Sequence, residues 1–466
     1  MVAVAVVLVG MWGLSAVPWT FVVTCLVYAA SLVVVEVDRR LRRPELAWWV
    51  TNSVLLPWGG LVILPWALRL YSGDAWEIGL GEPVAPGLPN TWALNLLALL
   101  GLTVGTLLAG RGGGRFEASV EPPVVSGRRL LLAFGLLMAV YFVSFVIAGR
   151  PLAAGWLLSG EYTYSSSIDT GVSFGFLDLA PTACVALVLA VTAQRCVRLA
   201  RPTRAELVVL VMTLLVVVGS GVRFRVFLLG FGWLLIQLRL GSGTRAVGQR
   251  IRLVILLVVV AGASFYGLGY LGIARSDHSG RYHEVAKSSV VSLDVIGIQE
   301  RLVARGAQPG VLGGGSYLEL PGQFVPRRLT GGNKDLPAAQ QVVGDYLDPR
   351  SGFSAPCWFE AALNGGLGAV FGMSAVLGLL LVRLQIKATE TRSSMVRLVH
   401  LVGPAFMLIN YQLFSRLLLF QMLITVGSLL VGGWLATRCV RRVAESPPRA
   451  APARPTHPPG SVATAG

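Results

Sequence analysis

Hydrophobic residues are gathered in long runs along this chain of 466 residues, and short polar segments separate one run from the next. A run of about 18 or more apolar residues is long enough to cross a bilayer as an α-helix. Because the runs are solidly apolar, they do not fit a membrane β-barrel, in which apolar and polar positions alternate. The pattern predicts twelve spans, at residues 2–17, 19–36, 50–70, 91–110, 130–148, 174–194, 206–221, 223–240, 253–273, 366–386, 397–414 and 417–436.

Composition agrees with this pattern. Hydrophobic residues make up 54% of the chain and charged residues only 13%, with a mean hydropathy of +0.69. A soluble domain of this length needs more charge to cover its surface. We therefore predict an all-α, polytopic integral membrane protein with about 12 transmembrane helices.

The net charge of +16 is placed on one side of the predicted spans. Five short loops carry four Lys or Arg each and the C-terminal tail carries five, which together account for 25 of the 39 basic residues. Basic loops mark the cytoplasmic side of a membrane. The charge therefore predicts that both termini are cytoplasmic, and it argues against a nucleic-acid partner.

Four regions follow from this topology. Residues 1–273 hold the first nine helices, residues 274–365 form one large extracytoplasmic loop, and residues 366–437 hold the last three helices. Residues 438–466 are rich in Pro and Ala and are predicted to be a disordered cytoplasmic tail. The large loop is predicted to be without regular structure, and loops of that length are usually functional.

Four arginines are predicted near the outer ends of spans: Arg223, Arg225, Arg275 and Arg416. A charge at membrane depth is costly and rarely faces lipid. Each arginine on its own fits interfacial anchoring equally well. As a set they favour binding of a polyanionic lipid head group, because guanidinium groups bind phosphate oxygens with two parallel hydrogen bonds.

The stretch "SAPCWFEAALNGGLGAVFGM" places a carboxylate and an amide where a span begins. Glu360 is predicted in the first helical turn and Asn364 one turn deeper on the same face. The glycines that follow, including Gly368 and Gly372, would allow close helix packing or close approach of a ligand. A carboxylate at a helix N-terminus also has a purely structural explanation, so capping and a functional site both remain open.

Other chemical signatures are weak. The chain lacks a glycine-rich loop ending in Lys-Ser or Lys-Thr, which argues against an ATP-driven pump. Asp277, His278, His283 and Glu284 lie close together, but no second cluster completes a metal site. We therefore predict no metal and no cofactor.

Two loop segments, "GGGSYLELPGQFVPRRLTGGNKD" and "SAPCWFEAALNGGLGAVFGM", resemble the outer loop of Wzy-type oligosaccharide repeat-unit polymerases, the O-antigen polymerase family. The Tyr, Pro-Arg and Asn-Lys positions of that family correspond to Tyr317, Pro326–Arg327 and Asn333–Lys334. Its Glu-x-x-x-Asn-aromatic-Gly signature corresponds to Glu360, Asn364 and Gly366, with Gly365 in place of the usual aromatic residue.

The resemblance implies a GT-C-like membrane glycosyltransferase of the bacterial plasma membrane. It would transfer glycan from undecaprenyl pyrophosphate to the terminal sugar of another lipid-linked repeat unit, with a flippase and a chain-length regulator as partners. The four arginines would bind pyrophosphate. Glu360 would position the loop or act as general base, and Asp277, His283 and Glu319 are the alternative bases. Substrate binding would fall to Tyr317, Arg327, Lys334, Asn364 and Trp358, the aromatic rings stacking on sugars.

Two rivals remain open at the level of sequence. A ligase of the same superfamily would move the glycan to a different acceptor. A sugar-lipid flippase or other transporter would place its charges inside the helix bundle rather than in a long outer loop.

Overall fold

We describe a computed structural model of the chain. It describes residues 19–44, 46, 51–72, 89–110, 127–147, 174–198, 203–219, 295–304, 306–323, 341–342 and 356–390, with scattered positions at 225–236 and 422–435. Every regular element in this part of the chain is a helix. The predicted all-α class is therefore confirmed for the described residues.

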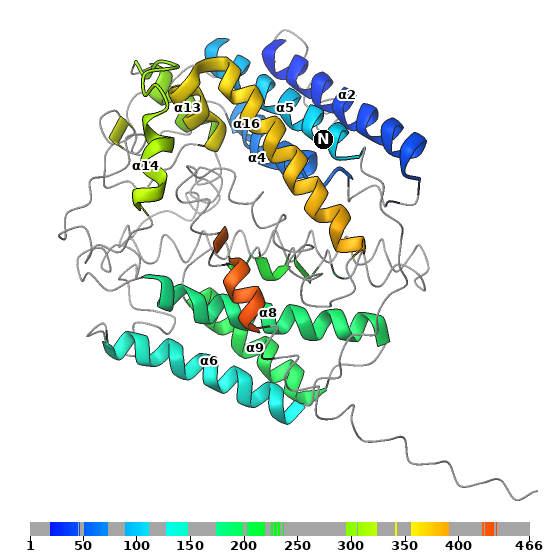
Figure 1. Cartoon of the computed structure of the whole chain (residues 1–466), viewed down its shortest axis with the longest axis vertical. Coiled ribbons are helices and arrows are strands. Elements are labelled where there is room, and N and C mark those ends of the chain that lie inside the picture. Colours follow the sequence, from blue (N-terminus) through cyan, green and yellow to red (C-terminus); the bar gives the residue numbers. More distant parts are fainter. Residues whose placement is uncertain are drawn as a thin grey trace, which may run out of the picture.

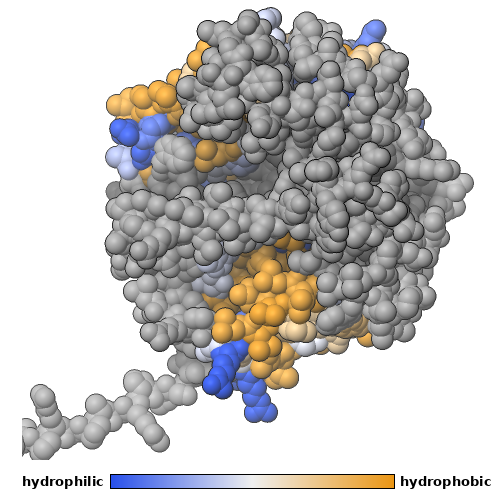
Figure 2. Space-filling view, turned by 180° about the vertical axis from the view of Figure 1, so that it is seen from behind, coloured by the Kyte–Doolittle hydropathy of each residue, from blue (hydrophilic) through white to orange (hydrophobic). Residues whose placement is uncertain are grey.

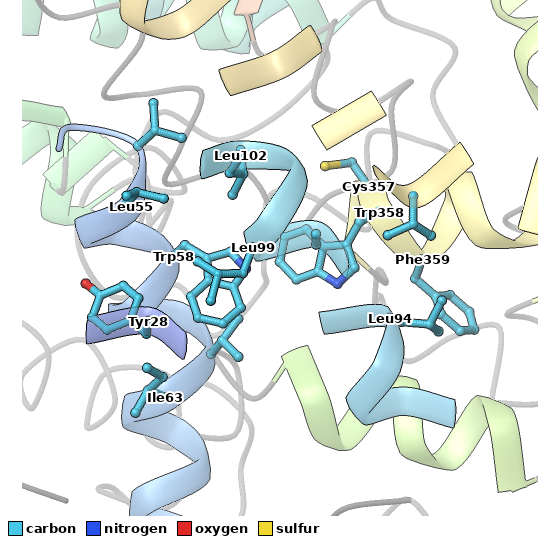
Figure 3. Close-up of a cluster of buried hydrophobic side chains, with 14 of the residues drawn as sticks. Tyr28, Leu55, Trp58, Ile63, Leu94, Leu99, Leu102, Cys357, Trp358 and Phe359 are labelled. Carbon is cyan, nitrogen blue, oxygen red and sulfur yellow. The ribbon is translucent and has the colours of Figure 1, made fainter. Parts of the chain in front are cut away.

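Five helices share one hydrophobic core and form the first helix group: α2 (Trp19–Arg42), α4 (Leu55–Ser72), α5 (Pro89–Ala109), α13 (Val295–Ala304) and α16 (Cys357–Glu390). Aromatic pairs join α2 to α4. Tyr28 stacks on Trp58 with ring centroids 5.8 Å apart, and Phe21 meets Trp66 edge-on at 5.3 Å. Figure 3 shows this core, in which Trp358 and Phe359 of α16 lie beside Leu94 and Leu99 of α5.

Three helices form a second helix group: α6 (Gly127–Ile147), α8 (Phe174–Arg198) and α9 (Arg204–Gly219). It occupies the lower part of Figure 1. A capping box begins α9: the Thr203 backbone N–H donates to Glu206 Oε2 (2.9 Å), and the Glu206 backbone N–H donates to Thr203 Oγ1 (3.4 Å).

Three helices of the first group, α2, α5 and α16, run in the same direction. The Trp92 indole near the start of α5 donates to the Thr20 carbonyl oxygen at the start of α2 (3.1 Å). At the other end, a Cβ built on Gly110 would lie 3.3 Å from the Asp38 carboxylate. Along α5 and α16 the contacts also advance in the same direction, from Gly101 against Phe371 to Gly105 against Ala375.

Small residues let α5 and α16 approach closely. A Cβ built on Gly101 would meet the Phe371 carbonyl oxygen at 2.5 Å, and one on Gly378 would meet the Leu102 carbonyl oxygen at 2.7 Å. Gly105, one turn after Gly101, abuts the Ala375 backbone in the same way. This is the small-xxx-small packing common between membrane helices.

The glycines predicted to pack closely are different ones. Cβ atoms built on Gly368 and Gly372 would have no described neighbour within 4 Å, and both residues are exposed. These two glycines therefore do not pack against a described helix, and the alternative, close approach of a ligand, stays a prediction. The packing glycines lie a turn or more further along α16 and on α5.

Seven predicted spans coincide with helices, although their boundaries shift: α2, α4, α5, α6, α8, α9 and α16. Among the described residues, three segments are long and apolar enough to cross a membrane: Trp19–Arg42, Thr91–Ala109 and Cys357–Lys387. The predicted spans 2–17, 253–273 and 397–414 and the tail 438–466 lie outside the described residues. Figure 2 shows apolar side chains gathered on described parts of the surface, with hydrophilic ones at their edges.

The predicted outer loop 274–365 is not without structure. It contains α13 and α14 (Gly315–Gln323). α13 packs against α4 and α5, and α14 packs against α16. Moreover, α16 begins at Cys357 and not at 366, so the last predicted loop residues belong to a helix.

Candidate functional site

The helix α16 is broken near its start. Gly365 and Gly366 have non-helical dihedral angles, with φ +66° and ψ −158° at Gly366. L-residues with a side chain rarely adopt that conformation. The break separates a short helix of residues 357–364, the α16 stub, from the long apolar helix that follows.

Loop residues form hydrogen bonds with the backbone carbonyl oxygens at the C-terminal end of the stub. An uninterrupted helix would pair the carbonyl oxygens of Ala362 and Leu363 with the N–H groups four residues later. The Gly310 and Leu312 N–H groups donate to those carbonyl oxygens instead, at 2.8 and 2.9 Å. The outer loop thus supplies the hydrogen bonds that the helix end lacks.

Three buried side chains link α14 to the stub. The Ser316 hydroxyl donates to Glu360 Oε1 (2.8 Å) and accepts from Asn364 Nδ2 (2.7 Å). The Ser316 backbone N–H donates to Asn364 Oδ1 (3.2 Å). The three residues are 1%, 2% and 6% exposed, and we call them the Ser316–Glu360–Asn364 cluster.

Two features of this cluster were predicted. Glu360 lies in the first turn of α16. Asn364 lies one turn deeper on the same buried face, where its Nδ2 also donates to the Glu360 backbone carbonyl oxygen (2.7 Å). Both N–H groups of the Asn364 amide are therefore engaged within the protein. The geometry makes Asn364 a clamp between loop and helix, which does not fit its predicted role in direct substrate binding.

The indole of Trp358 anchors the stub to α5. Its Nε1 donates to Asn95 Oδ1 (3.0 Å), and the side chain has no exposed surface. Asn95 in turn donates to the Thr91 carbonyl oxygen (3.0 Å). Because its ring is enclosed by α5 and the core (Figure 3), Trp358 packs the helices together and does not present the predicted sugar-stacking surface.

Two other predicted residues lie on α14 next to Ser316. Tyr317 is partly buried, and its hydroxyl donates to the Met373 sulfur (3.2 Å). Glu319 is exposed, three residues after Ser316.

Arg225 belongs to the other helix group. Its side chain is 2% exposed, and it interacts electrostatically with Cys184, in the middle of α8.

The remaining predicted site residues lie outside the described residues: Asp277, His283, Arg223, Arg275, Arg327, Lys334 and Arg416. Within the described part of the chain, no group of three His, Cys, Asp or Glu side chains could hold a metal ion.

Sequence reasoning missed Ser316 and Asn95. Ser316 lies inside the segment "GGGSYLELPG", but nothing in that segment indicates a partner 44 or 48 residues later. Asn95 interrupts an apolar helix with a polar side chain, and that irregularity is a usable signal. No family model, curated protein or solved structure matches this chain.

Proposed function

We propose that this chain is a membrane glycosyltransferase that polymerises lipid-linked oligosaccharide repeat units. One observation carries the proposal: the Glu360 and Asn364 positions of the family-like signature meet the outer loop, at Ser316, in one buried cluster. A buried carboxylate placed at a helix break, beside an apolar span, is expensive to maintain. Such a feature is typical of a site that has to hold a loop in one position.

The proposed reaction joins two lipid-linked glycans. A hydroxyl oxygen of the acceptor's terminal sugar attacks the anomeric carbon of the donor glycan, and the bond from that carbon to the pyrophosphate oxygen breaks. Undecaprenyl pyrophosphate leaves with the bond's electron pair, and a base accepts the hydroxyl proton. Arginines stabilise the charge of the leaving group. Glu360 positions the outer loop through Ser316, and the base remains to be chosen among Glu360, Asp277, His283 and Glu319.

Buried Arg225 supports an anion site within the membrane region, because a charge that is 2% exposed there needs a functional reason. A charge inside a bundle is also what the transporter alternative requires. The test must therefore separate polymerase, ligase and flippase, and the lipid intermediate that accumulates can do so.

For the fold, we propose a GT-C-like arrangement with twelve spans and with both termini in the cytoplasm of a bacterial cell.

Substitution of Glu360 by Ala tests the function. Loss of the carboxylate leaves the buried Ser316 hydroxyl without its acceptor, at a cost of about 1–3 kcal/mol. In the native host we expect loss of long polymer. Single repeat units on undecaprenyl pyrophosphate should accumulate on the external face of the plasma membrane. The measurement is lipid extraction with glycan sizing, and accessibility of the sugars to an external lectin reports the face.

Leu318→Ala is the matched control, because Leu318 lies on the same helix and is 82% exposed. It should give normal polymer. Single repeats confined to the cytoplasmic face would indicate a flippase, and full-length polymer retained on the lipid carrier would indicate a ligase. Unchanged polysaccharide in a strain lacking the whole chain would refute all three assignments.

A further inference from the structure

A pocket of about 190 Å³ lies between the outer loop and the start of two helices. Apolar walls come from Leu94 of α5, Val303 of α13 and Phe359 and Leu363 of the stub. Gly306, Gln308 and Pro309 are among the loop residues that line the other side. Gln308 and Pro309 are exposed, so this side of the pocket faces outward. None of these residues belongs to the Ser316–Glu360–Asn364 cluster.

The loop wall of the pocket is fixed by the way α13 ends. The Gly306 N–H donates to the Val303 carbonyl oxygen (3.0 Å) and the Ala307 N–H to the Leu302 carbonyl oxygen (2.9 Å). With Gly306 at φ +102°, these two bonds form a Schellman motif, a well-defined helix ending. A few residues on, Gly310 is bonded to the stub. The pocket is therefore pre-formed, as small-molecule sites usually are.

The size of the pocket limits what it can hold. Pockets for drug-sized ligands enclose roughly 300–1,000 Å³, so this pocket is too small for an oligosaccharide or a polyprenyl chain. At about 30 Å³ per molecule it has room for roughly six waters. One six-membered sugar ring is of that size.

The lining matches the two kinds of surface on such a ring. The apolar walls suit the C–H face of a pyranose, and an aromatic side chain such as Phe359 is a suitable partner. At the rim, the Gln308 amide offers both a donor and an acceptor for hydroxyl groups. We propose that this pocket binds a single pyranose ring, the terminal sugar of the acceptor repeat unit.

The assignment to the acceptor rests on the proposed function, whereas pyranose binding itself does not. The pocket and the cluster use adjacent faces of the same stub. Phe359 and Leu363 line the pocket, while Glu360 and Asn364 bind Ser316. The hydrogen bonds from Ser316 that fix the position of the stub therefore also fix the pocket wall next to Glu360.

The test measures protection of a cysteine at the rim. Pro309→Cys places the cysteine at the exposed rim of the pocket and keeps the Gln308 amide. It is introduced into the full-length chain, which is purified in lipid nanodiscs and modified with a polar thiol reagent. Methyl glucopyranoside, methyl galactopyranoside and N-acetylglucosamine are added at millimolar concentration, with sorbitol as an open-chain control. We expect at least one pyranose to slow the modification several-fold and sorbitol to leave it unchanged.

Val311→Cys is the control position, because it is 61% exposed on the same loop and does not line the pocket. Its modification rate should not respond to sugar. In a second variant, Val303→Phe fills the pocket from the α13 side, and protection at residue 309 should then be lost. Absence of protection by all three pyranoses, or protection that persists in the filled variant, would overturn the proposal.

Failure of the pocket and failure of the proposed function are distinguishable, because protection requires no transfer reaction. Protection of the cysteine without accumulation of single repeats in the Glu360→Ala strain would support the sugar site and contradict the polymerase proposal. Accumulation of single repeats without protection of the cysteine would support the polymerase proposal and contradict the sugar site.

Discussion

Glu360 is held by a hydrogen bond that does not require its charge. The Ser316 hydroxyl donates to Oε1 at 2.8 Å, and a Gln side chain offers a carbonyl oxygen of the same shape at that point. A general base, by contrast, must exchange a proton and cannot be replaced by an amide. The two roles of Glu360 can therefore be separated by one isosteric change.

We predict that Glu360→Gln retains most of the polymer, since the bond to Ser316 is kept. The loss of stability should be under about 1 kcal/mol, against about 1–3 kcal/mol for Glu360→Ala. The distribution of polysaccharide chain lengths and the thermal stability of the purified protein are the measurements. If the Gln variant accumulates single repeats as the Ala variant does, the carboxylate itself takes part in the reaction.

At the scale of elements, the notable feature is a short helix bound to a loop instead of to its own continuation. The stub makes hydrogen bonds to Gly310 and Leu312 at its end and to Asn95 on its other side. Within a membrane, a broken helix is tolerated only where other protein groups satisfy the freed backbone. Here the outer loop supplies the N–H groups that satisfy the freed backbone. The position of the loop and the break in α16 therefore depend on each other.

The break depends on Gly366, and we predict that Gly366→Ala destabilises the protein by about 1–3 kcal/mol. The cause is a side chain forced into the conformation at φ +66° and ψ −158°. The midpoint of thermal inactivation in detergent and the polymer yield should both fall.

Gly368→Ala is the matched control two residues later. A Cβ there has open space among the described residues, and Ala is a better helix former than Gly by about 1 kcal/mol. This variant should be neutral or slightly stabilised. Equal stability of the two variants would show that the break is not an obligatory feature of α16.

The sequence could predict the helices but not the break in α16. Long apolar runs locate α2, α5 and α16 because the length needed to span a bilayer is a strong constraint. The same glycines that make a break possible also suit close packing, so Gly365 and Gly366 could not be told apart from Gly368 and Gly372. Burial of Glu360 and Asn364 on one face followed from helical spacing, whereas their partner Ser316 is fixed by tertiary contacts far along the chain.

For the whole molecule, helix direction links the described structure to the predicted topology. Basic loops require spans 19–36, 91–110 and 366–386 to run from outside to inside. The helices that contain them, α2, α5 and α16, are parallel by their contacts. The starts of α6 and α9 also lie together, since a Cβ on Gly127 would be 3.1 Å from the Ala205 Cβ. These helix directions agree with the alternation of spans that the basic loops predict. Which end of the helices faces the cytoplasm stays a prediction.

That side can be tested with two exposed positions at opposite ends of the first helix group. Val311 is 61% exposed in the outer loop, and the Arg40 side chain is 74% exposed at the end of α2. Ser316 is unsuitable as a labelling position despite its place in the loop, because it is buried. We predict that an impermeant maleimide labels Val311→Cys in intact cells stripped of their outer layers, and labels Arg40→Cys only in inside-out vesicles. The opposite pattern would place the Ser316–Glu360–Asn364 cluster on the cytoplasmic side, away from externally displayed repeat units, and the polymerase proposal would fail with it.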